Sequence, residues 1–246
     1  MSRTTFLVTG AGRGIGSGLV ASLLLRPSST VIAAVRDPSK GPAKAQIDLP
    51  KGGGSKIIIV KIDSSVETDP TKAVSILQRD HNITALDVVI VNAGIAHSSG
   101  PVIKTSTAAI RDHLAVNTIG PLLLFQATAP LLKATVTSIL GTISGMESLE
   151  SLPPALSPYG ASKAALNWFI RRLHFEEMWL TSFLLHPGTV ATDMVKSVID
   201  GTDLKLEDLG AITVEQSVSD LVQRVDTASR DVSGTFQNHD GTYLPW

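Results

Sequence analysis

Short apolar runs alternate with stretches of helical spacing along the whole 246-residue chain. The first run, at residues 5–8, is followed by apolar residues at helical spacing as far as Pro27. Further runs that predict strands stand at residues 30–35, 57–60, 86–91, 136–143, 183–186 and 234–237. Continuous apolar strands that alternate with helices are typical of a parallel sheet covered on both faces. We therefore expect one doubly wound α/β domain over residues 1–246, with seven parallel strands.

A glycine-rich turn joins the first strand to the first helix. Its residues are Gly10-Ala11-Gly12-Arg13-Gly14-Ile15-Gly16. The glycines let the backbone approach a ligand closely, and the new helix offers unpaired amides to a phosphate. The strict G-x-G-x-x-G spacing of dinucleotide folds is absent. The turn predicts a nucleotide pyrophosphate site, although a turn that needs glycine only for its dihedral angles has the same pattern.

The residues after the second strand predict which nucleotide is bound. In dinucleotide folds, an acid at this point selects the ribose 2′-hydroxyl of NAD, and an arginine accepts the 2′-phosphate of NADP. Arg36 comes first here, and Arg13 in the glycine-rich turn adds a second planar cation. These residues favour NADP(H). Asp37 favours NAD instead if the strand ends one residue later.

Polar and glycine residues recur where later strands end. Asp63 follows the third strand, and Asn92 and Gly94 follow the fourth. Ligands of open parallel sheets bind outside the carboxyl ends of the strands, on the same side as the glycine-rich turn. Each residue alone also suits a cap or a turn. Together they predict a binding site at this edge.

A tyrosine and a lysine lie one helical turn apart in a later helix. Tyr159 and Lys163 share a helix face because their separation is four residues. A nearby ammonium favours the phenolate, so the pair suits a general acid or base, although a packed tyrosine beside a surface lysine has the same spacing. Asn117 and Pro121 interrupt the helix expected at residues 107–134. We expect Asn117 to satisfy a local distortion or to act at the site.

Composition and charge exclude several classes of function. The net charge is −1 without a block of like charges, which gives no electrostatic basis for binding nucleic acid or an anionic membrane. The chain has no cysteine, and its six histidines show no ligand spacing, so we expect no metal site. The longest apolar runs are far shorter than the roughly 18 residues of a membrane span. We expect a cytoplasmic protein with a small-molecule partner.

Several of these motifs together resemble the short-chain dehydrogenase/reductase family. They are Thr9-Gly10-x-x-x-Gly14-Ile15-Gly16, Asn92-Ala93-Gly94, Asn117, Ser144, Tyr159-x-x-x-Lys163 and Pro187-Gly188, in the order of the family. The resemblance spans nearly the whole chain and implies a Rossmann-type fold. Residues 174–188 and the terminal residues 240–246 are similar to fungal reductases of the norsolorinic acid ketoreductase type, which act on aromatic polyketide ketones.

The resemblance implies a role for each matching residue. Tyr159 would donate a proton to the substrate carbonyl, and Ser144 would hydrogen-bond the same oxygen. Lys163 would lower the tyrosine pKa and hold the nicotinamide ribose, and Asn117 would anchor a water that links Lys163 to solvent. The implied cofactor-binding residues are Gly10, Arg13, Gly14, Ile15, Gly16, Arg36, Asp63, Asn92, Gly94, Tyr159, Lys163, Pro187, Gly188, Val190 and Thr192. Many family members have two adjacent serines where this chain has Ser144-Gly145, so Thr142 remains an alternative to Ser144.

The resemblance implies NADPH-dependent reduction of a ketone to a secondary alcohol. Residues 194–212 have the length of a substrate flap, and the flap is rich in Met194, Val195, Val198, Ile199 and Leu204, which favours an apolar, aromatic or polyketide-derived ketone. The alternatives are an alcohol dehydrogenase that works in the oxidative direction and a sensor or scaffold that binds NADP without turnover. The family also implies a homodimer or homotetramer, paired through the helices at residues 107–134 and 159–179.

Overall fold

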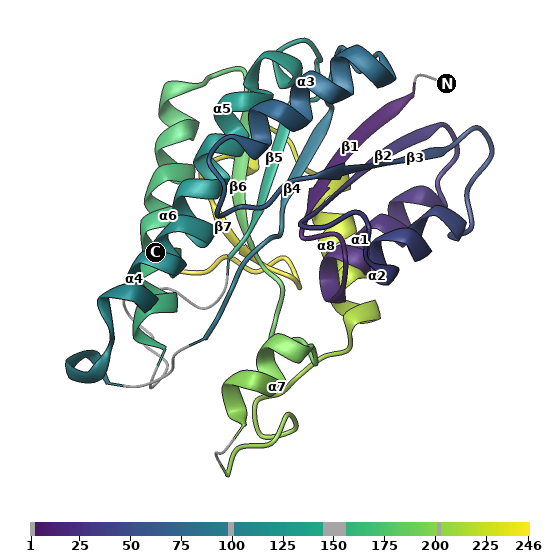
Figure 1. The fold of residues 1–246 in the computed structure, drawn as a ribbon. Coiled ribbons are helices and arrows are strands. Elements are labelled where there is room, and N and C mark those ends of the chain that lie inside the picture. Colours follow the sequence, from purple (N-terminus) through teal and green to yellow (C-terminus); the bar gives the residue numbers. More distant parts are fainter. Residues whose placement is uncertain (1–2, 98–100, 145–155, 201–202) are drawn as a thin grey trace.

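The structure, a computed structural model, describes residues 3–97, 101–144, 156–200 and 203–246. Within these residues, seven strands form one parallel sheet in the order β3-β2-β1-β4-β5-β6-β7 (Figure 1). The strands are β1 (Thr4–Thr9), β2 (Ser29–Val35), β3 (Lys56–Lys61), β4 (Val88–Val91), β5 (Ile139–Ile143), β6 (Thr181–His186) and β7 (Phe236–Asn238). The predicted fold class, a single Rossmann-type doubly wound domain, is confirmed.

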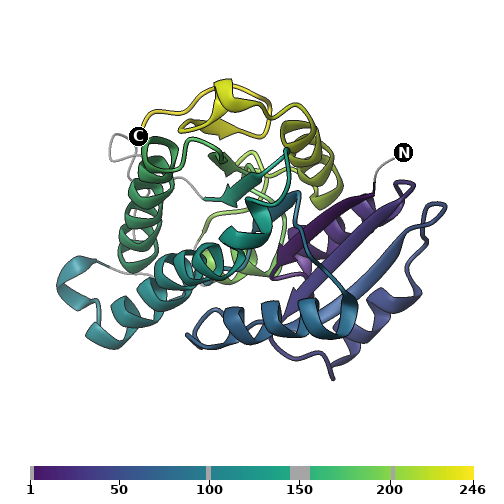
Figure 2. The same ribbon diagram turned by 90° about the horizontal axis from the view of Figure 1, so that it is seen from above.

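Helices cover both faces of the sheet (Figure 2). One layer contains α1 (Gly14–Leu24), α2 (Gly41–Ala45) and α8 (Val214–Asp226). The other contains α3 (Asp69–His81), α4 (Thr107–Leu114), α5 (Gly120–Leu132) and α6 (Ser157–Glu176). The remaining helices are α7 (Asp193–Ile199) and the short 3-10 turns η1 (Gln46–Asp48), η2 (Val102–Lys104) and η4 (Arg230–Val232).

Strand β2 shows how the sequence divides the core between these layers. All seven of its residues are buried. Because successive side chains of a strand point to opposite faces, Ile32 packs into the cluster that contains α3, α5 and α6, and Val31 and Ala33 pack into the cluster that contains α1 and α8. A strand that is buried on both faces needs a continuous apolar run, which is the pattern that the sequence shows.

The strand order reverses between β1 and β4, which places the crevice of the fold there. Connections from β1 lead outward to β2 and β3, and the chain then returns to β4 on the other side of β1. In open parallel sheets, ligands bind outside the carboxyl ends of the strands at such a switch point. Helix α7 projects beyond this carboxyl edge (Figure 1).

The stretch predicted as one helix over residues 107–134 contains a local change of helix type. A π-helix at Ala115–Ile119 joins α4 to α5, and Asn117 lies within it. Taken together, Thr107–Leu132 is long and apolar enough to cross a membrane by length and composition alone. It packs against α3 and α6 in the fold, as a core helix does.

Several predicted strand boundaries are wrong: β4, β6 and β7 begin two residues from the expected positions, and β5 differs most. The strand expected at residues 136–143 begins only at Ile139, because Ser138 has a left-handed φ of 39° that a strand cannot contain. The side chain of Ser138 donates instead to the carbonyl oxygen of Leu132, 2.7 Å away.

Candidate active site

The tyrosine and lysine predicted on one helix face lie on α6 at the carboxyl edge of the sheet. Helix α6 begins with Ser157-Pro158, and proline is favoured in the first helical turn because it needs no amide partner there. Lys163 is buried, and its Nζ donates to the carbonyl oxygen of Ile143 at the end of β5, 3.0 Å away. The same Nζ lies 5.8 Å from the ring centroid of Tyr159. The shared face predicted from the spacing is confirmed.

Asn117 lies next to this lysine, and it stabilises a local distortion of the helix, which is the first of the two possibilities raised by its position. It is fully buried in the π-helix, and its Nδ2 donates to the carbonyl oxygen of Ile95 at 2.9 Å and to Ser162 Oγ at 3.0 Å. Its Oδ1 accepts from the Ile95 amide at 2.9 Å. A Cβ on Gly94 would lie 3.3 Å from Asn117 Oδ1 and 3.7 Å from Lys163 Nζ. The fold thus brings Gly94, Asn117 and Lys163 together.

The hydroxyl hydrogen of Ser144 is already used in the structure. Ser144 is fully buried, and its Oγ donates to Asn167 Oδ1 at 2.7 Å. A hydroxyl has one hydrogen to donate, so donation to a ligand requires the Ser144 side chain to turn away from Asn167. Thr142 is also fully buried, and its Oγ1 has no hydrogen-bond partner among the described residues. Gly145, which matters for the comparison with a serine pair, lies outside the described residues.

Asn167 is a site residue that the sequence reasoning missed. It is buried on α6, one helical turn beyond Lys163 and two turns beyond Tyr159. The signal was the continuation of the same four-residue spacing, because residues 159, 163 and 167 follow one helix face. The helix therefore presents Lys163 and Asn167 to the end of β5, with Tyr159 on the same helix face.

The glycine-rich turn packs tightly against the end of β4. Gly10 has a left-handed φ of 64°, and a Cβ there would lie 2.9 Å from both Ala93 Cα and Asn92 Nδ2. Asn92 Nδ2 donates to the carbonyl oxygen of Thr9 at 2.9 Å, and Thr9 Oγ1 accepts from the amides of Asn92 and Ala93 at 3.0 and 3.1 Å. In this structure Asn92 ties the turn to β4, and Thr9, which the sequence motif includes without a role, makes the matching bonds.

The start of α1 fits the pyrophosphate of a dinucleotide. Arg13 at its N-cap has an extended backbone and makes no side-chain cap, and the first turn holds no acidic residue. Gly14 has a left-handed φ of 53° that gives the backbone a concave bend. Unpaired amides at a helix N-terminus attract an anion. The residues present therefore suit the phosphates of a nicotinamide cofactor.

Arg36, Asp37 and Asp63 gather at the ends of β2 and β3. Arg36 is exposed and makes no hydrogen bond or ion pair within the described residues. Asp37 Oδ1 accepts from the amide and the hydroxyl of Ser39 at 2.9 and 2.6 Å, and these bonds lower the pKa of Asp37. Burial raises the pKa of Asp63, but hydrogen bonds from Ser65 and the Arg36 charge outweigh it, so the net pKa is lowered. Both carboxylates are therefore ionised at neutral pH.

The loop after β6 faces the glycine-rich turn. A Cβ on Gly14 would lie 3.5 Å from Thr192 Cγ2, and Arg13 NH1 lies 3.8 Å from Asp193 Oδ2 in an exposed ion pair. Val190 forms a parallel bridge with Ile212, so the chain before α7 lies beside the chain before α8. The fold thus places the predicted phosphate residues beside the predicted nicotinamide residues.

Two features elsewhere lie apart from this cluster. A shallow hollow lined by Arg3, Lys56 and His81 lies at the amino-terminal edge of the sheet, away from Tyr159 and Lys163. Within the described part of the chain, no group of three or more His, Asp or Glu side chains could hold a metal ion.

Comparison with known proteins agrees with this geometry. The family model of short chain dehydrogenases matches residues 4–203. The norsolorinic acid ketoreductase nor1 of Dothistroma septosporum is 46% identical over 255 residues, which cover 99% of this chain and 93% of the relative. The norsolorinic acid ketoreductase of Aspergillus parasiticus is 39% identical over 254 residues, which cover 99% of this chain and 91% of the relative. The predicted similarity to this type of reductase is confirmed.

Solved structures show the same fold. The NADPH-bound carbonyl reductase from chicken fatty liver superposes with a TM-score of 0.86 at 29% identity, over 100% of both chains. The carbonyl reductase Sniffer of D. melanogaster superposes with a TM-score of 0.84 at 28% identity, also over 100% of both chains. From its sequence, its fold and the arrangement of its polar edge, this chain belongs to the short-chain dehydrogenase/reductase family of oxidoreductases.

Proposed function

We propose that the protein reduces an apolar ketone, aromatic or polyketide-derived, to a secondary alcohol with NADPH. The observation that carries this proposal is the Tyr159–Lys163 pair on α6, with Lys163 Nζ held 3.0 Å from the carbonyl oxygen of Ile143 at the carboxyl edge. The names of the fungal relatives, which are norsolorinic acid ketoreductases, support a ketone as substrate.

The side chains of the site divide the work of such a reduction. The reduced nicotinamide supplies a hydride when it is bound. A carbonyl that accepts hydride gathers negative charge on oxygen, and Tyr159 donates the proton that neutralises it. The Lys163 ammonium stabilises the phenolate left behind and holds the nicotinamide ribose. Because Tyr159 can act as acid or base, the same residues serve an alcohol dehydrogenase working in the oxidative direction.

Ser144, Thr142 and Asn117 complete the proposed chemistry. Ser144 donates to the substrate oxygen after its Oγ turns from Asn167, and Thr142 is the alternative because its hydroxyl lacks a partner within the described residues. Asn117 borders Gly94 beside Lys163 Nζ and anchors the water through which the lysine exchanges protons with solvent. Both hydrogens of its side-chain amide are engaged, so Asn117 binds that water through its Oδ1 or its backbone carbonyl oxygen.

The Tyr159→Phe variant tests the proposed mechanism. Removing the phenolic hydroxyl should lower kcat by at least about 10²–10⁴-fold, the contribution of a general acid, while NADPH binding stays measurable. The matched control is Tyr243→Phe, because Tyr243 is the other of the two tyrosines and is 64% exposed near the C-terminus. The loss of NADPH absorbance in the presence of an aromatic ketone measures turnover. Equal turnover by the wild type and Tyr159→Phe would exclude the mechanism.

For the cofactor we propose NADP(H), bound along the carboxyl edge. The proposed residues are Gly10, Arg13, Gly14, Ile15, Gly16, Arg36, Asp63, Asn92, Gly94, Tyr159, Lys163, Pro187, Gly188, Val190 and Thr192. The exposed Arg36 is available for a 2′-phosphate, and Asp37 is engaged with Ser39. Arg36→Ala should weaken NADPH by about 10–100-fold and leave NADH unchanged, since a charge-assisted bond contributes roughly 1.5–3 kcal/mol. If the preference for NADPH over NADH is unchanged in Arg36→Ala but the affinity for NADH changes in Asp37→Ala, the cofactor is NAD.

A screen of ketones and alcohols with both cofactors distinguishes this enzyme from a protein that binds NADP without turnover. Hydride transfer to any aromatic ketone supports the enzyme. Cofactor binding without transfer across the screen would favour a sensor or scaffold.

The apolar side chains of the flap support the proposed substrate class. On α7, Met194, Val195, Val198 and Ile199 are half-buried and recur at helical spacing, and Leu204 follows with 49% exposure. This apolar face is available to a flat aromatic ketone. Val198→Ser should raise KM for an aromatic ketone more than for a small aliphatic ketone, because only the larger substrate reaches α7. Equal changes in both KM values would contradict a role for the flap in substrate recognition.

We also propose a cytoplasmic homodimer or homotetramer. Trp168, Phe169 and Phe175 are exposed on α6, and Ile119 is exposed on the neighbouring π-helix. Large exposed apolar side chains on adjacent helices are suited to a subunit interface. Light scattering after gel filtration should give a multiple of 25.9 kDa for the wild type and a smaller mass for Trp168→Glu. A wild-type monomer would contradict this assembly.

A further inference from the structure

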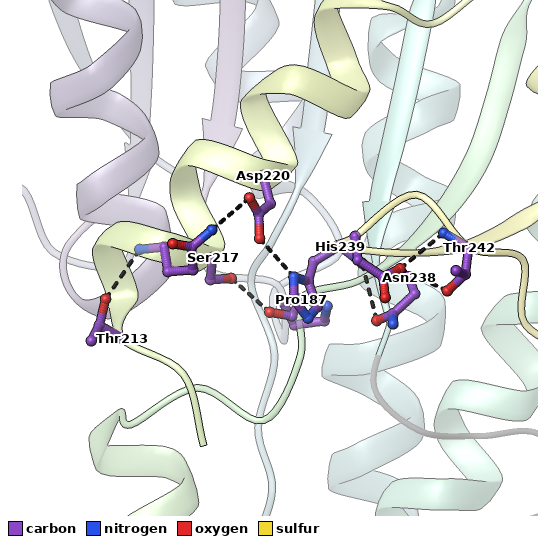
Figure 3. Close-up of polar contacts among 9 residues, drawn as sticks. Pro187, Thr213, Ser217, Asp220, Asn238, His239 and Thr242 are labelled. Atoms are coloured by element: carbon purple, nitrogen blue, oxygen red, sulfur yellow. Dashed lines mark hydrogen bonds and ion pairs between the residues drawn. The ribbon is translucent and has the colours of Figure 1, made fainter. Parts of the chain in front are cut away.

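The Pro187–Gly188 turn is held by side chains from two distant segments. Ser217 on α8 is fully buried, and its Oγ donates to the carbonyl oxygen of Pro187 at 2.7 Å (Figure 3). On the other side, the ring of His239, from the segment after β7, lies against Gly188. The turn itself has no regular secondary structure. Its position therefore depends on α8 and on the C-terminal segment.

His239 and Asp220 form a pair that joins these two segments. His239 Nδ1 lies 2.7 Å from Asp220 Oδ2, and the two side chains are only 20% and 18% exposed (Figure 3). A carboxylate can only accept, so His239 Nδ1 carries the hydrogen of this bond. A hydrogen bond to a carboxylate is about twice as strong as one between neutral groups.

Further hydrogen bonds hold the Asp220 side chain and the backbone at His239. Asp220 Oδ1 accepts from Gln216 Nε2 at 2.8 Å, one helical turn earlier on α8. The His239 amide donates to Asn238 Oδ1 at 3.0 Å, and the Asn238 amide donates to the carbonyl oxygen of Thr242 at 2.8 Å, which closes a tight loop. These bonds restrict the Asp220 side chain and the backbone at His239, which lowers the cost in conformational entropy of forming the pair.

The His239 ring lies against Gly188 in the turn, and Ile212 at the base of the flap lies against the same glycine. Gly188 has a left-handed φ of 78°, and a Cβ there would lie 3.0 Å from His239 Cδ2 and 2.9 Å from Ile212 Cδ1. The Ile212 amide donates to the carbonyl oxygen of Thr189 at 2.8 Å, and the Ala191 amide donates to that of Ile212 at 3.0 Å. A shift of the ring would therefore move both the turn and the two ends of the flap.

We propose that Asp220 and His239 are positioning residues that hold the Pro187–Gly188 turn, and with it the base of the flap, in the place that nicotinamide binding requires. This inference rests on the proposed function, in which Pro187, Gly188 and Val190 contact the nicotinamide end of the cofactor. Neither Asp220 nor His239 acts on the reacting atoms. Hydride transfer depends steeply on alignment, and a displacement of about 1 Å can lower a rate by roughly 10²-fold.

Steady-state kinetics of four single variants and one double variant measure this role. Asp220→Ala and His239→Ala should each lower kcat/KM for NADPH by about 10-fold or more. Asp220→Asn keeps an acceptor and His239→Asn keeps a donor, so each should recover part of that loss. The double alanine variant should be no worse than the worse single variant, because both changes break one interaction.

A binding comparison separates positioning from general destabilisation. Adenosine 2′,5′-bisphosphate carries the adenosine and 2′-phosphate of NADPH but no nicotinamide. In Asp220→Ala and His239→Ala, NADPH affinity should fall about 10-fold while the affinity for the bisphosphate stays unchanged. The matched control is Asp226→Ala. Asp226 is the last residue of the same helix, and its loss breaks an exposed ion pair with Arg26. Both affinities should stay at the wild-type values.

The outcomes distinguish this inference from the function on which it rests. If the wild type binds NADPH and reduces ketones, and the alanine variants have the same affinity and kcat/KM, the inference is overturned and the proposed function stands. An equal loss of affinity for both ligands would also overturn it, since the effect would then not belong to the nicotinamide end. If the alanine variants fail to fold, Asp220→Asn and His239→Asn decide by the same comparison. A wild type that binds no nicotinamide cofactor would overturn the proposed function and this inference with it.

Discussion

Replacing Gly16 by alanine sets helix propensity against close packing. Gly16 lies in α1, where alanine is intrinsically favoured over glycine by about 1 kcal/mol. A Cβ on Gly16 would lie 2.5 Å from Asn92 Nδ2 and closer still to the carbonyl oxygen of Gly10. The Gly10 oxygen belongs to the backbone, and Asn92 Nδ2 is held by its bond to the carbonyl oxygen of Thr9. Neither atom can move aside without disturbing the turn.

The size of the effect follows from these contacts. Overpacking costs about 1–3 kcal/mol. Displacement of the Asn92 amide from its acceptor adds about 1–3 kcal/mol, the cost of an unsatisfied buried group. After roughly 1 kcal/mol of helix propensity is subtracted, Gly16→Ala should lower the free energy of unfolding by about 3 kcal/mol. In a chain of 246 residues this corresponds to a fall in Tm of about 6–12 °C.

Urea denaturation followed by circular dichroism measures this difference, with two glycine variants as controls. Gly18 lies in the same helix, but a Cβ there would meet the Cγ2 end of the Val218 side chain at 2.7 Å, so Gly18→Ala should cost less. A Cβ on Gly12 would meet only Val35 Cγ1 at 3.8 Å, and Gly12→Ala should change stability little. A Gly16→Ala variant that is as stable as the wild type, or more stable, would refute the steric argument.

Three further results are expected. Thr142→Val should leave the free energy of unfolding unchanged or raise it, because the Thr142 hydroxyl has no partner in the described part of the chain, whereas Ser144→Ala should lower it by about 1–3 kcal/mol in urea denaturation. A kcat that falls by about 10²-fold in Thr142→Val, rather than in Ser144→Ala, would assign the oxyanion contact to Thr142. Burial lowers the pKa of His186 and of His113 below the ordinary value of about 6.5. As the pH falls through that value, the unfolded chain therefore binds more protons than the folded chain does. The free energy of unfolding should accordingly fall as the pH decreases from 7.5 to 5.5. A urea midpoint that is independent of pH over this interval would contradict this.

Much of the fold could be predicted from the sequence because its signals are local. The apolar run of residues 30–35 lies within the fully buried β2, since a strand covered on both faces favours apolar residues at successive positions. The four-residue separation of Tyr159 and Lys163 defined their shared face on α6, since helical geometry depends only on spacing. The strand boundary at Ile139 could not be predicted in this way, because the left-handed φ of Ser138 is stabilised by a bond to Leu132, in the preceding helix.

The partners of the polar side chains were decided by the tertiary structure. Ser144 and Asn167 are 23 residues apart in sequence, and they meet because α6 packs over the end of β5. Asp220 and His239 meet only where the segment after β7 passes α8, and neither shows a spacing that would single it out. Hydrophobic periodicity and glycine turns act within one element, and so the sequence by itself determined the order of the strands along the chain and of the main helices between them, but not the π-helix or α7. Hydrogen bonds between elements depend on how those elements pack, and only the folded chain determines which side chains they join.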